Sequence, residues 1–292
     1  MPMNKATFSL CLLLFLVNLQ PVYSQSFTEA FTEMGYSAVE QTEAVQLFKK
    51  DGNYLVGFNL QKMNVSSFQA VDSTKKSEVG NFLDNISSPF FNRIAYQDVI
   101  DNNEDAYIIN ASFFESYKSS TQLSYPIYTD DNWITSGSSI YGPTKQPKDE
   151  YYGEIELLAL QIGSESAKIT AFEKENNPKD LIMVSQNYKD HPALILANNR
   201  VTRFLLVTTL DENEDGKDEW LLLSIGLGNI VDRASELEKV NKQRYIMTLD
   251  GGSSVFFSHP TLGVLQKPAR YNPVNFQEML IDLPHYLVIK KK

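Results

Sequence analysis

The chain has 292 residues, a formal net charge of −10 and a single cysteine, Cys11. The acidic balance argues against nucleic acids and anionic membrane surfaces as partners, because both favour basic patches. One cysteine cannot build an intrachain disulfide framework, so the fold must rest on a hydrophobic core or a bound metal.

The first 24 residues have the pattern of a secretory signal peptide. Lys5 precedes an almost uninterrupted apolar run at residues 8–17, and Val22-Tyr23-Ser24 offers small or tolerated residues before a cleavage point. The run is shorter than the roughly 20 residues of a membrane span. We therefore expect cleavage after Ser24, export to the periplasm or the extracellular space, and no membrane span in the mature chain.

Residues 25–43 are polar and are expected to form a loosely held lead-in to one domain at residues 44–292. Short apolar runs bounded by turn residues predict the strands of that domain. The predicted strands cover residues 54–60, 107–109, 155–162, 167–172, 193–196, 203–210, 220–225, 245–249, 255–257 and 286–289.

Apolar spacing predicts helices at residues 90–100 and 230–241. Residues 121–148, which are rich in Pro, Ser, Gly and Asp, predict a long surface loop or lid. The fold class is therefore α+β: a single β-rich domain with a few helices packed on a mixed sheet.

The most informative motif is Leu249-Asp250-Gly251-Gly252-Ser253-Ser254. Its two glycines allow tight turning and close approach of a ligand to the main chain, and its carboxylate can act as an acid, a base or a ligand. The alternative is an ordinary hairpin, because Asp-Gly is a strong turn signal between strands.

Two further motifs carry groups suited to binding. Asn110 ends a predicted strand and is followed by Phe113 and Phe114; its amide can both donate and accept hydrogen bonds, and the aromatic rings can line a sugar site. Arg203 enters a strongly apolar strand, where arginine suits either phosphate binding or a structural ion pair.

In this order, the motifs resemble those of the phosphodiester glycosidase family, which includes exported bacterial members. The resemblance covers roughly residues 105–290. It comprises the segment from Asn110 to Phe114, Gln186 with Pro192-Ala193-Leu194, Arg203-Phe204-Leu205, the strand and helix that follow, the Asp250 motif, and Leu283-Pro284-His285-Tyr286-Leu287.

The resemblance implies an exported hydrolase that cleaves the glycosidic side of a sugar-1-phosphodiester, such as an N-acetylglucosamine-1-phosphodiester. It implies catalytic roles for Asp250, Arg203 and Asn110. Arg203 would hold the phosphate and Asp250 would act as a base or position the water. The residues implied in substrate binding are Phe113, Gly251, Gly252, Ser254 and His285.

Four positions depart from the commoner family pattern: Ala111, Phe204-Leu205, Ser253 and His285. They keep an alternative open, in which the chain is a non-catalytic carbohydrate-binding or cell-envelope-associated protein on the same fold. No organic cofactor is expected, because Gly226-Leu227-Gly228 lacks the rest of a dinucleotide fingerprint.

An acidic segment between two predicted strands resembles part of a calcium-binding loop. Side-chain oxygens at positions 1, 3, 5 and 9 and a glycine at position 6 follow the first part of the EF-hand spacing. The candidate ligands are Asp211, Asn213, Asp215, Glu219 and the main-chain carbonyl of Lys217. A structural Ca²⁺ ion is one interpretation, and a solvated acidic hairpin is the other.

Overall fold

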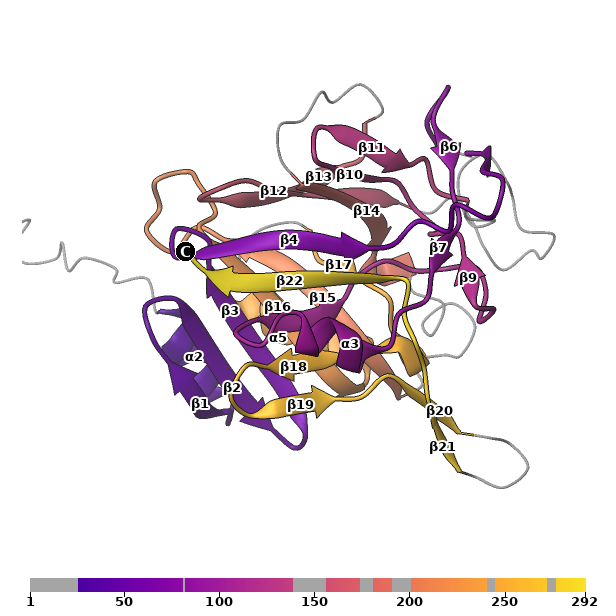
Figure 1. Ribbon diagram of the computed structural model, residues 1–292. Coiled ribbons are helices and arrows are strands. Elements are labelled where there is room, and N and C mark those ends of the chain that lie inside the picture. Colours follow the sequence, from indigo (N-terminus) through magenta and orange to yellow (C-terminus); the bar gives the residue numbers. More distant parts are fainter. Residues whose placement is uncertain are drawn as a thin grey trace, which may run out of the picture.

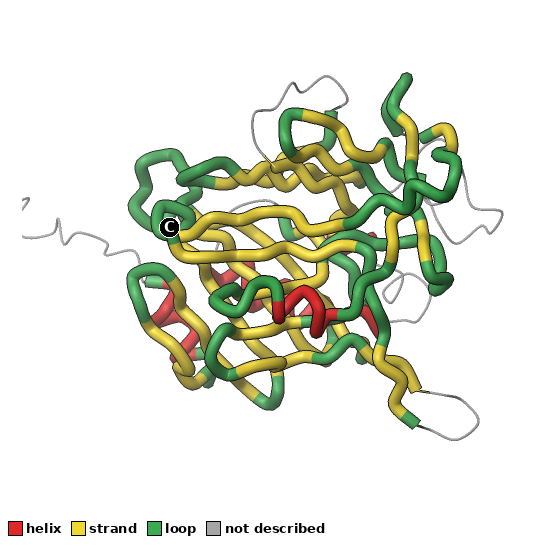
Figure 2. Tube along the Cα trace, in the orientation of Figure 1, coloured by secondary structure: helices red, strands yellow, loops and turns green. Residues whose placement is uncertain are grey.

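Two antiparallel β-sheets face each other in the computed structural model, which describes residues 26–80, 82–138, 156–173, 181–190, 201–240, 245–271 and 277–292. Figure 1 shows the two sheets stacked, with helix α3 on the near side, and Figure 2 shows how strongly strands predominate over helices.

The larger sheet, sheet A, has eleven strands. In spatial order its main path is β1 (Ser37–Gln41), β2 (Val45–Lys50), β3 (Asn53–Asn59), β16 (Trp220–Gly228), β15 (Thr202–Leu210), β17 (Met247–Thr248), β14 (Leu181–Asn187), β10 (Ile127–Thr129) and β11 (Asn132–Thr135). Off this path, β12 (Leu157–Ile162) pairs with β14 and with β13 (Ala167–Ala171).

The smaller sheet, sheet B, has five strands. In spatial order they are β19 (Gly263–Gln266), β18 (Phe257–His259), β8 (Tyr107–Asn110), β22 (His285–Lys291) and β4 (Met63–Gln69). Three short ribbons pair β5 (Glu78–Val79) with β6 (Ser87–Ser88), β7 (Phe91–Asn92) with β9 (Ser120–Thr121), and β20 (Ala269–Tyr271) with β21 (Glu278–Leu280).

Side chains alternate along the strands between two buried faces. In β15, Leu205 and Val207 pack into the core between the sheets, while Phe204 and Leu206 pack into a second core on the outer face of sheet A. A strand covered on both faces favours apolar residues at consecutive positions, which is why residues 204–207 form a continuous apolar run.

Helices α2 (Phe27–Glu33) and α5 (Ile230–Val240) cover the outer face of sheet A. Phe27 and Phe31, one helical turn apart, are both buried there, and the Ser26 hydroxyl caps α2 by accepting a hydrogen bond from the Glu29 amide. The expectation of a loosely held lead-in is therefore wrong, because this segment belongs to the core.

Helix α3 (Tyr96–Asp101) covers the outer face of sheet B (Figure 1). Its buried Val99 packs beside Ile108 of β8 and Val288 of β22 in a third core. The structure therefore has four layers, with helix, sheet A, sheet B and helix in that order.

Three expectations need correction. Every pairing between described strands is antiparallel, so the sheet is not mixed; hairpins such as β2–β3 and β15–β16 need only short connections. The predicted helix at residues 90–100 is short and follows strand β7. The described part of the expected lid contains β10 and β11, and residues 120–128 are buried.

The predicted signal peptide, the predicted strand at residues 193–196 and the Pro192 segment lie outside the described residues. None of the described helices is both long and apolar enough to cross a bilayer.

Candidate functional site

Three of the expected site residues meet where β8, β17 and β22 approach one another. Asn110 ends β8, Asp250 follows β17, and His285 begins β22. The main chain of Ala111 links them, because its carbonyl accepts the Asp250 amide at 3.0 Å and its own amide donates to the His285 carbonyl at 3.3 Å. We call Asn110, Asp250, Ser254 and His285 the Asp250 centre.

The Asp250 motif is a connection between the two sheets. It leaves β17 of sheet A, forms the one-turn 3₁₀ helix η2 (Gly252–Ser254), and enters β18 of sheet B. The hairpin alternative is therefore wrong, since β17 and β18 do not pair with each other. Only Gly252 has a positive φ, +59°, and a Cβ placed there would meet open space; Gly251 has an ordinary extended conformation.

Asn110 holds this connection in place. Its side-chain amide donates to the Asp250 carbonyl at 2.5 Å, and its side-chain oxygen accepts the Phe256 amide at 2.8 Å. The residue is only 1% exposed. Asn110 thus acts as a positioning residue for the segment from Asp250 to Phe256, where we expected direct contact with substrate.

The Asp250 carboxyl lies in a water-poor environment. It is 8% exposed, and burial raises its pKa to about 8, although a hydrogen bond from Ser254 opposes the shift. At neutral pH the carboxyl therefore keeps its proton and can donate it, which makes it a suitable general acid.

His285 is buried as a neutral imidazole between two serines. Its Nδ1 lies 2.9 Å from the Ser112 hydroxyl, and its Nε2 lies 2.8 Å from the Ser67 hydroxyl. Ser67 donates its own proton to Gln69, so Nε2 must donate to Ser67 and Nδ1 must accept from Ser112. Burial lowers the pKa of His285 to about 3.

Arg203 lies in β15 beside the same connection. Its guanidinium donates to the main-chain carbonyls of Val255 at 2.9 Å, of Ala269 at 3.4 Å and of Lys267. It also lines a cavity of about 560 Å³ together with Ser253, Lys267, Arg270 and Glu278, which we call the arginine cavity.

Tyr117 borders the arginine cavity from a distant part of the chain. Its hydroxyl lies 2.9 Å from the Ser253 hydroxyl, and the guanidinium groups of Arg93 and Arg270 lie 5.3 and 5.4 Å from its ring centroid. Arg270, Glu278 and Tyr117 were missed at the level of sequence. The only indication in the sequence was that two basic residues, Lys267 and Arg270, lie three positions apart in an acidic chain.

Phe113 is half-buried and packs edge-on against Tyr125, with ring centroids 6.0 Å apart. The Tyr125 hydroxyl donates to the side-chain oxygen of Gln186, another residue of the family pattern. Ser254 is buried beside Asp250. Phe113 follows β8 and Asn110, Ser254 ends η2, and Gln186 lies in β14, which pairs with β17 just before Asp250.

The acidic segment at residues 211–219 lies elsewhere. It closes the β15–β16 hairpin, in which Leu210 pairs with Trp220. Arg203 is near the other end of β15, roughly 23 Å away at about 3.3 Å per residue. Among the side chains that the structure describes, no three His, Cys, Asp or Glu residues converge closely enough to hold a metal ion.

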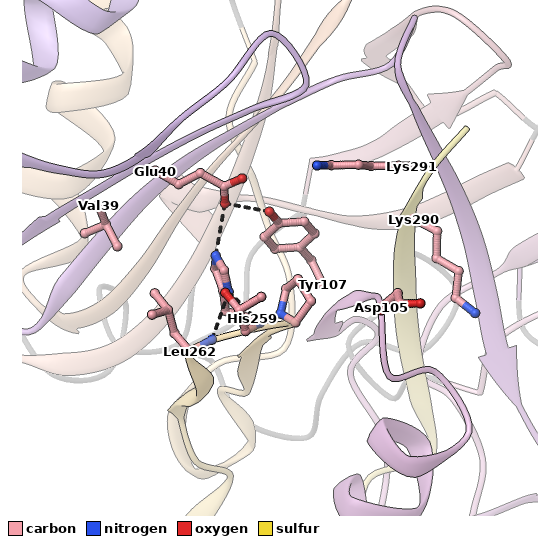
Figure 3. A pocket seen from close by; sticks show the side chains of 10 residues that line it. Val39, Glu40, Asp105, Tyr107, His259, Leu262, Lys290 and Lys291 are labelled. Atoms are coloured by element: carbon pink, nitrogen blue, oxygen red, sulfur yellow. Dashed lines mark hydrogen bonds and ion pairs between the residues drawn. The ribbon is translucent and has the colours of Figure 1, made fainter.

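A second polar cluster was not anticipated from the sequence. It lines a cavity of about 760 Å³ formed by β1, β8, the β18–β19 turn and β22 (Figure 3). Glu40 accepts hydrogen bonds from the Tyr107 hydroxyl at 2.6 Å and from His259 Nε2 at 3.0 Å. His259 Nδ1 accepts the amides of Thr261 and Leu262, so both ring nitrogens are engaged. We call Glu40, Tyr107 and His259 the Glu40 cluster.

A β-bulge directs Glu40 toward this cavity. Ala38 of β1 pairs with Phe48, but Glu40 pairs with Leu47, so that Val39 is an extra residue without a register partner. Glu40 thereby shares the face of Leu47, which points toward the core between the sheets. Asp105, Lys290 and Lys291 line the other side of the cavity (Figure 3).

No family model and no curated protein matches the sequence. Among solved structures, the chain is similar to the catalytic domain of zebrafish N-acetylglucosamine-1-phosphodiester alpha-N-acetylglucosaminidase, auto-inhibited by its pro-peptide. That match has a TM-score of 0.52 and 12% identity, and covers 88% of this chain and 82% of that chain. A hypothetical protein from Synechocystis aligns with a TM-score of 0.42 and 10% identity over 88% of this chain and 64% of that one. The zebrafish comparison shows a shared fold with a phosphodiester glycosidase.

Proposed function

We propose that the chain is an exported hydrolase that cleaves the glycosidic side of a sugar-1-phosphodiester. The observation that carries this proposal is the buried carboxyl of Asp250, which burial keeps protonated at neutral pH, on a connection that borders the arginine cavity. The zebrafish neighbour supports the reaction class. Export rests on the leader pattern of residues 1–24.

In the proposed reaction, water attacks the anomeric carbon while the bond from that carbon to the phosphate oxygen breaks. Arg203 and Arg270 neutralise the charge of the departing phosphomonoester, since guanidinium groups suit phosphate oxygens. Asp250 donates its proton to the leaving oxygen, a role typical of a carboxyl whose pKa is raised. This assignment replaces the base role that we expected from the sequence.

Such a reaction also needs a group to activate the water, because glycosidases commonly use two carboxylates. Glu278 of β21 lines the arginine cavity and is our candidate for this second carboxylate. The positively charged wall binds the phosphate end, and the open space above Gly252 leaves room for the sugar.

One observation favours the alternative of a non-catalytic carbohydrate-binding or cell-envelope-associated protein. The guanidinium of Arg203 already donates to three main-chain carbonyls, which is typical of a structural arginine. In that alternative, the cavity binds a glycan phosphate without cleavage, and Arg270 is the main anion contact.

The test is sugar release from a panel of sugar-1-phosphodiesters and ordinary aryl glycosides by the chain beginning at Gln25. We expect release from the phosphodiesters only, with a fall of at least about 100-fold in Asp250→Asn, the scale of general acid–base catalysis. Glu40→Gln makes the same chemical change at a carboxylate outside the site and should retain activity.

The pH profile separates the two roles of Asp250. If Asp250 is the acid, kcat falls above about pH 8, whereas a base role predicts that kcat rises through this range. If the folded wild-type protein releases no sugar from any phosphodiester, and the wild type and Asp250→Asn bind the phosphodiesters with the same affinity, the hydrolase proposal is wrong and the binding alternative holds.

A further inference from the structure

Two arginines that line the arginine cavity are held in different ways. The Arg203 guanidinium donates to three main-chain carbonyls. The Arg270 guanidinium has no hydrogen bond and no ion pair with the residues that the structure describes. It lies instead over the ring of Tyr117, with its central carbon 5.4 Å from the ring centroid. The N–H donors of Arg270 therefore remain available to a ligand in the cavity.

Tyr117 is fixed in place from several directions, although the residue is 47% exposed. Its hydroxyl lies 2.9 Å from the Ser253 hydroxyl, and its ring packs edge-on against Phe114, with centroids 5.1 Å apart. The Arg93 guanidinium lies 5.3 Å from the same ring centroid. Arg93 also donates to the main-chain carbonyl of Tyr117 and, at 2.8 Å, to that of Asp282. The ring is therefore a fixed platform at the edge of the cavity.

An aromatic ring can orient a guanidinium without using its hydrogen-bond donors. The attraction acts between the positive charge and the negative face of the ring, so the N–H groups stay free. Carbonyl acceptors orient a guanidinium as well, but they engage the donors that a phosphate needs, as they do at Arg203. A guanidinium whose plane is already fixed can donate to two phosphate oxygens at once with little loss of freedom.

We propose that Tyr117 is a positioning residue that holds the Arg270 guanidinium ready to bind the phosphate of the substrate. This role rests on the proposed function and deepens it, because it gives the direct phosphate contact to Arg270. Arg203, which main-chain carbonyls hold, contributes its charge to the wall of the cavity. Lys267 lines the same cavity, so positive side chains gather there in a chain whose net charge is −10. This local charge favours an anionic ligand over a neutral sugar.

The test is the affinity of the chain beginning at Gln25 for inorganic phosphate, measured by titration calorimetry at low ionic strength and separately from sugar release. We expect Arg270→Gln to weaken binding at least about 10-fold, and Tyr117→Leu about 5-fold, the scale of a cation–π contact. Tyr117→Phe keeps the ring and should stay within about 2-fold of the wild type. Lys168→Gln is the charge control: Lys168 is exposed on β13, outside the cavity, and its loss should leave the affinity unchanged.

A double variant separates positioning from a general structural effect. If Tyr117 acts through Arg270, Tyr117→Leu should cause no further loss of phosphate affinity in the Arg270→Gln background. The inference is overturned if Tyr117→Leu weakens binding equally in both backgrounds, if it has no effect, or if Tyr117→Phe loses as much. A wild type that binds no phosphate overturns it too. A wild type that binds phosphate but releases no sugar contradicts the hydrolase proposal alone, and the same variants still test the positioning role.

Discussion

The Asp250 centre and the Glu40 cluster lie at opposite ends of β8, and each contains one acidic residue and one histidine. The two acidic side chains have different hydrogen-bond partners. In the Glu40 cluster, a tyrosine hydroxyl and an imidazole N–H both donate to the carboxylate. In the Asp250 centre, Ser254 is the one side-chain donor to the carboxyl among the described residues, burial raises the pKa of Asp250, and His285 bonds to two serines instead.

This comparison shows that the hydrogen-bond donors around a carboxyl group, and its burial, determine whether the group suits a structural contact or a chemical step. Two donors on one carboxylate satisfy its charge, which is what a structural contact between β1 and β18 requires. A desolvated carboxyl with a single donor keeps its proton at neutral pH and can donate it to a leaving group, which is useful for chemistry and costly for stability. The variants that follow test whether the two regions differ as we infer.

The largest expected effect on stability is at Asn110. Asn110→Ala leaves the Asp250 carbonyl and the Phe256 amide buried without partners, so we expect the free energy of unfolding to fall by about 3 kcal/mol. Denaturation by urea measures this loss. Asn110→Asp keeps the acceptor for Phe256 but places a buried carboxyl oxygen against the Asp250 carbonyl, so we expect it to lose at least as much at neutral pH. A loss below about 1 kcal/mol in the alanine variant would contradict the positioning role.

The next largest expected effect is the dependence of stability on pH. The folded-state pKa of Asp250 is raised to about 8, so the folded state keeps a proton that the unfolded state releases above about pH 4. The free energy of unfolding then falls as the pH rises through this window, by about 1.4 kcal/mol per pH unit.

The contribution of His285 to the pH dependence of stability has the opposite sign. Its folded-state pKa is lowered to about 3, so the unfolded state binds a proton that the folded state lacks, and stability rises as the pH rises toward about 6.5. The two contributions offset each other between about pH 4 and 6.5. From about pH 6.5 to 8 only the fall from Asp250 remains, about 2 kcal/mol in total.

Asp250→Asn should remove that fall and leave the rise from His285 visible in acid. Urea denaturation at a series of pH values tests both parts, with Glu40→Gln as the variant that should keep the wild-type curve shape. An unchanged slope from pH 6.5 to 8 in Asp250→Asn would show that the Asp250 carboxyl ionises normally in the folded protein.

The smallest expected effect belongs to the Glu40 cluster. Glu40→Gln and Tyr107→Phe should each lower the free energy of unfolding by about 1 kcal/mol, because each weakens a hydrogen bond to the carboxylate. The double variant should lose less than the sum, since both changes remove the same 2.6 Å contact. Losses that add within about 0.5 kcal/mol would mean that the two groups are energetically independent.

Strands buried on both faces were predictable because their sequences carry the signal directly. Residues 204–207 and 220–223 are continuous apolar runs, and the structure places them in β15 and β16. Helix α2 was missed because only Phe27 and Phe31 anchor it, among polar residues that suggest a lead-in.

The expected lid was wrong because composition does not separate exposed loops from buried polar segments. Ser120, Thr121 and Gln122 are buried, and the Gln122 amide donates to the Ser88 carbonyl at 2.9 Å. Hydrogen bonds of this kind satisfy buried polar groups, and no local sequence pattern predicts them.

The residues of the candidate site also differ in whether the sequence alone could predict them. Asp250 was predicted as a site residue because its motif is local, and His285 was predicted through the family pattern. Ser67 and Tyr117 could not be found, because strand register and long-range packing bring them to His285 and Ser253 from far away in the chain. The Glu40 cluster depends on the bulge in β1, which the sequence does not mark.

That bulge also bears on how copies of the protein meet in concentrated solution. β1 is an edge strand of sheet A, and an unpaired edge is a template on which a second chain can add a strand and begin to aggregate. The extra residue Val39 breaks the regular hydrogen-bonding ladder of this edge, and Glu40 places a carboxylate within it. A single inserted residue thus both aims a side chain inward and discourages edge-to-edge association of the largest sheet.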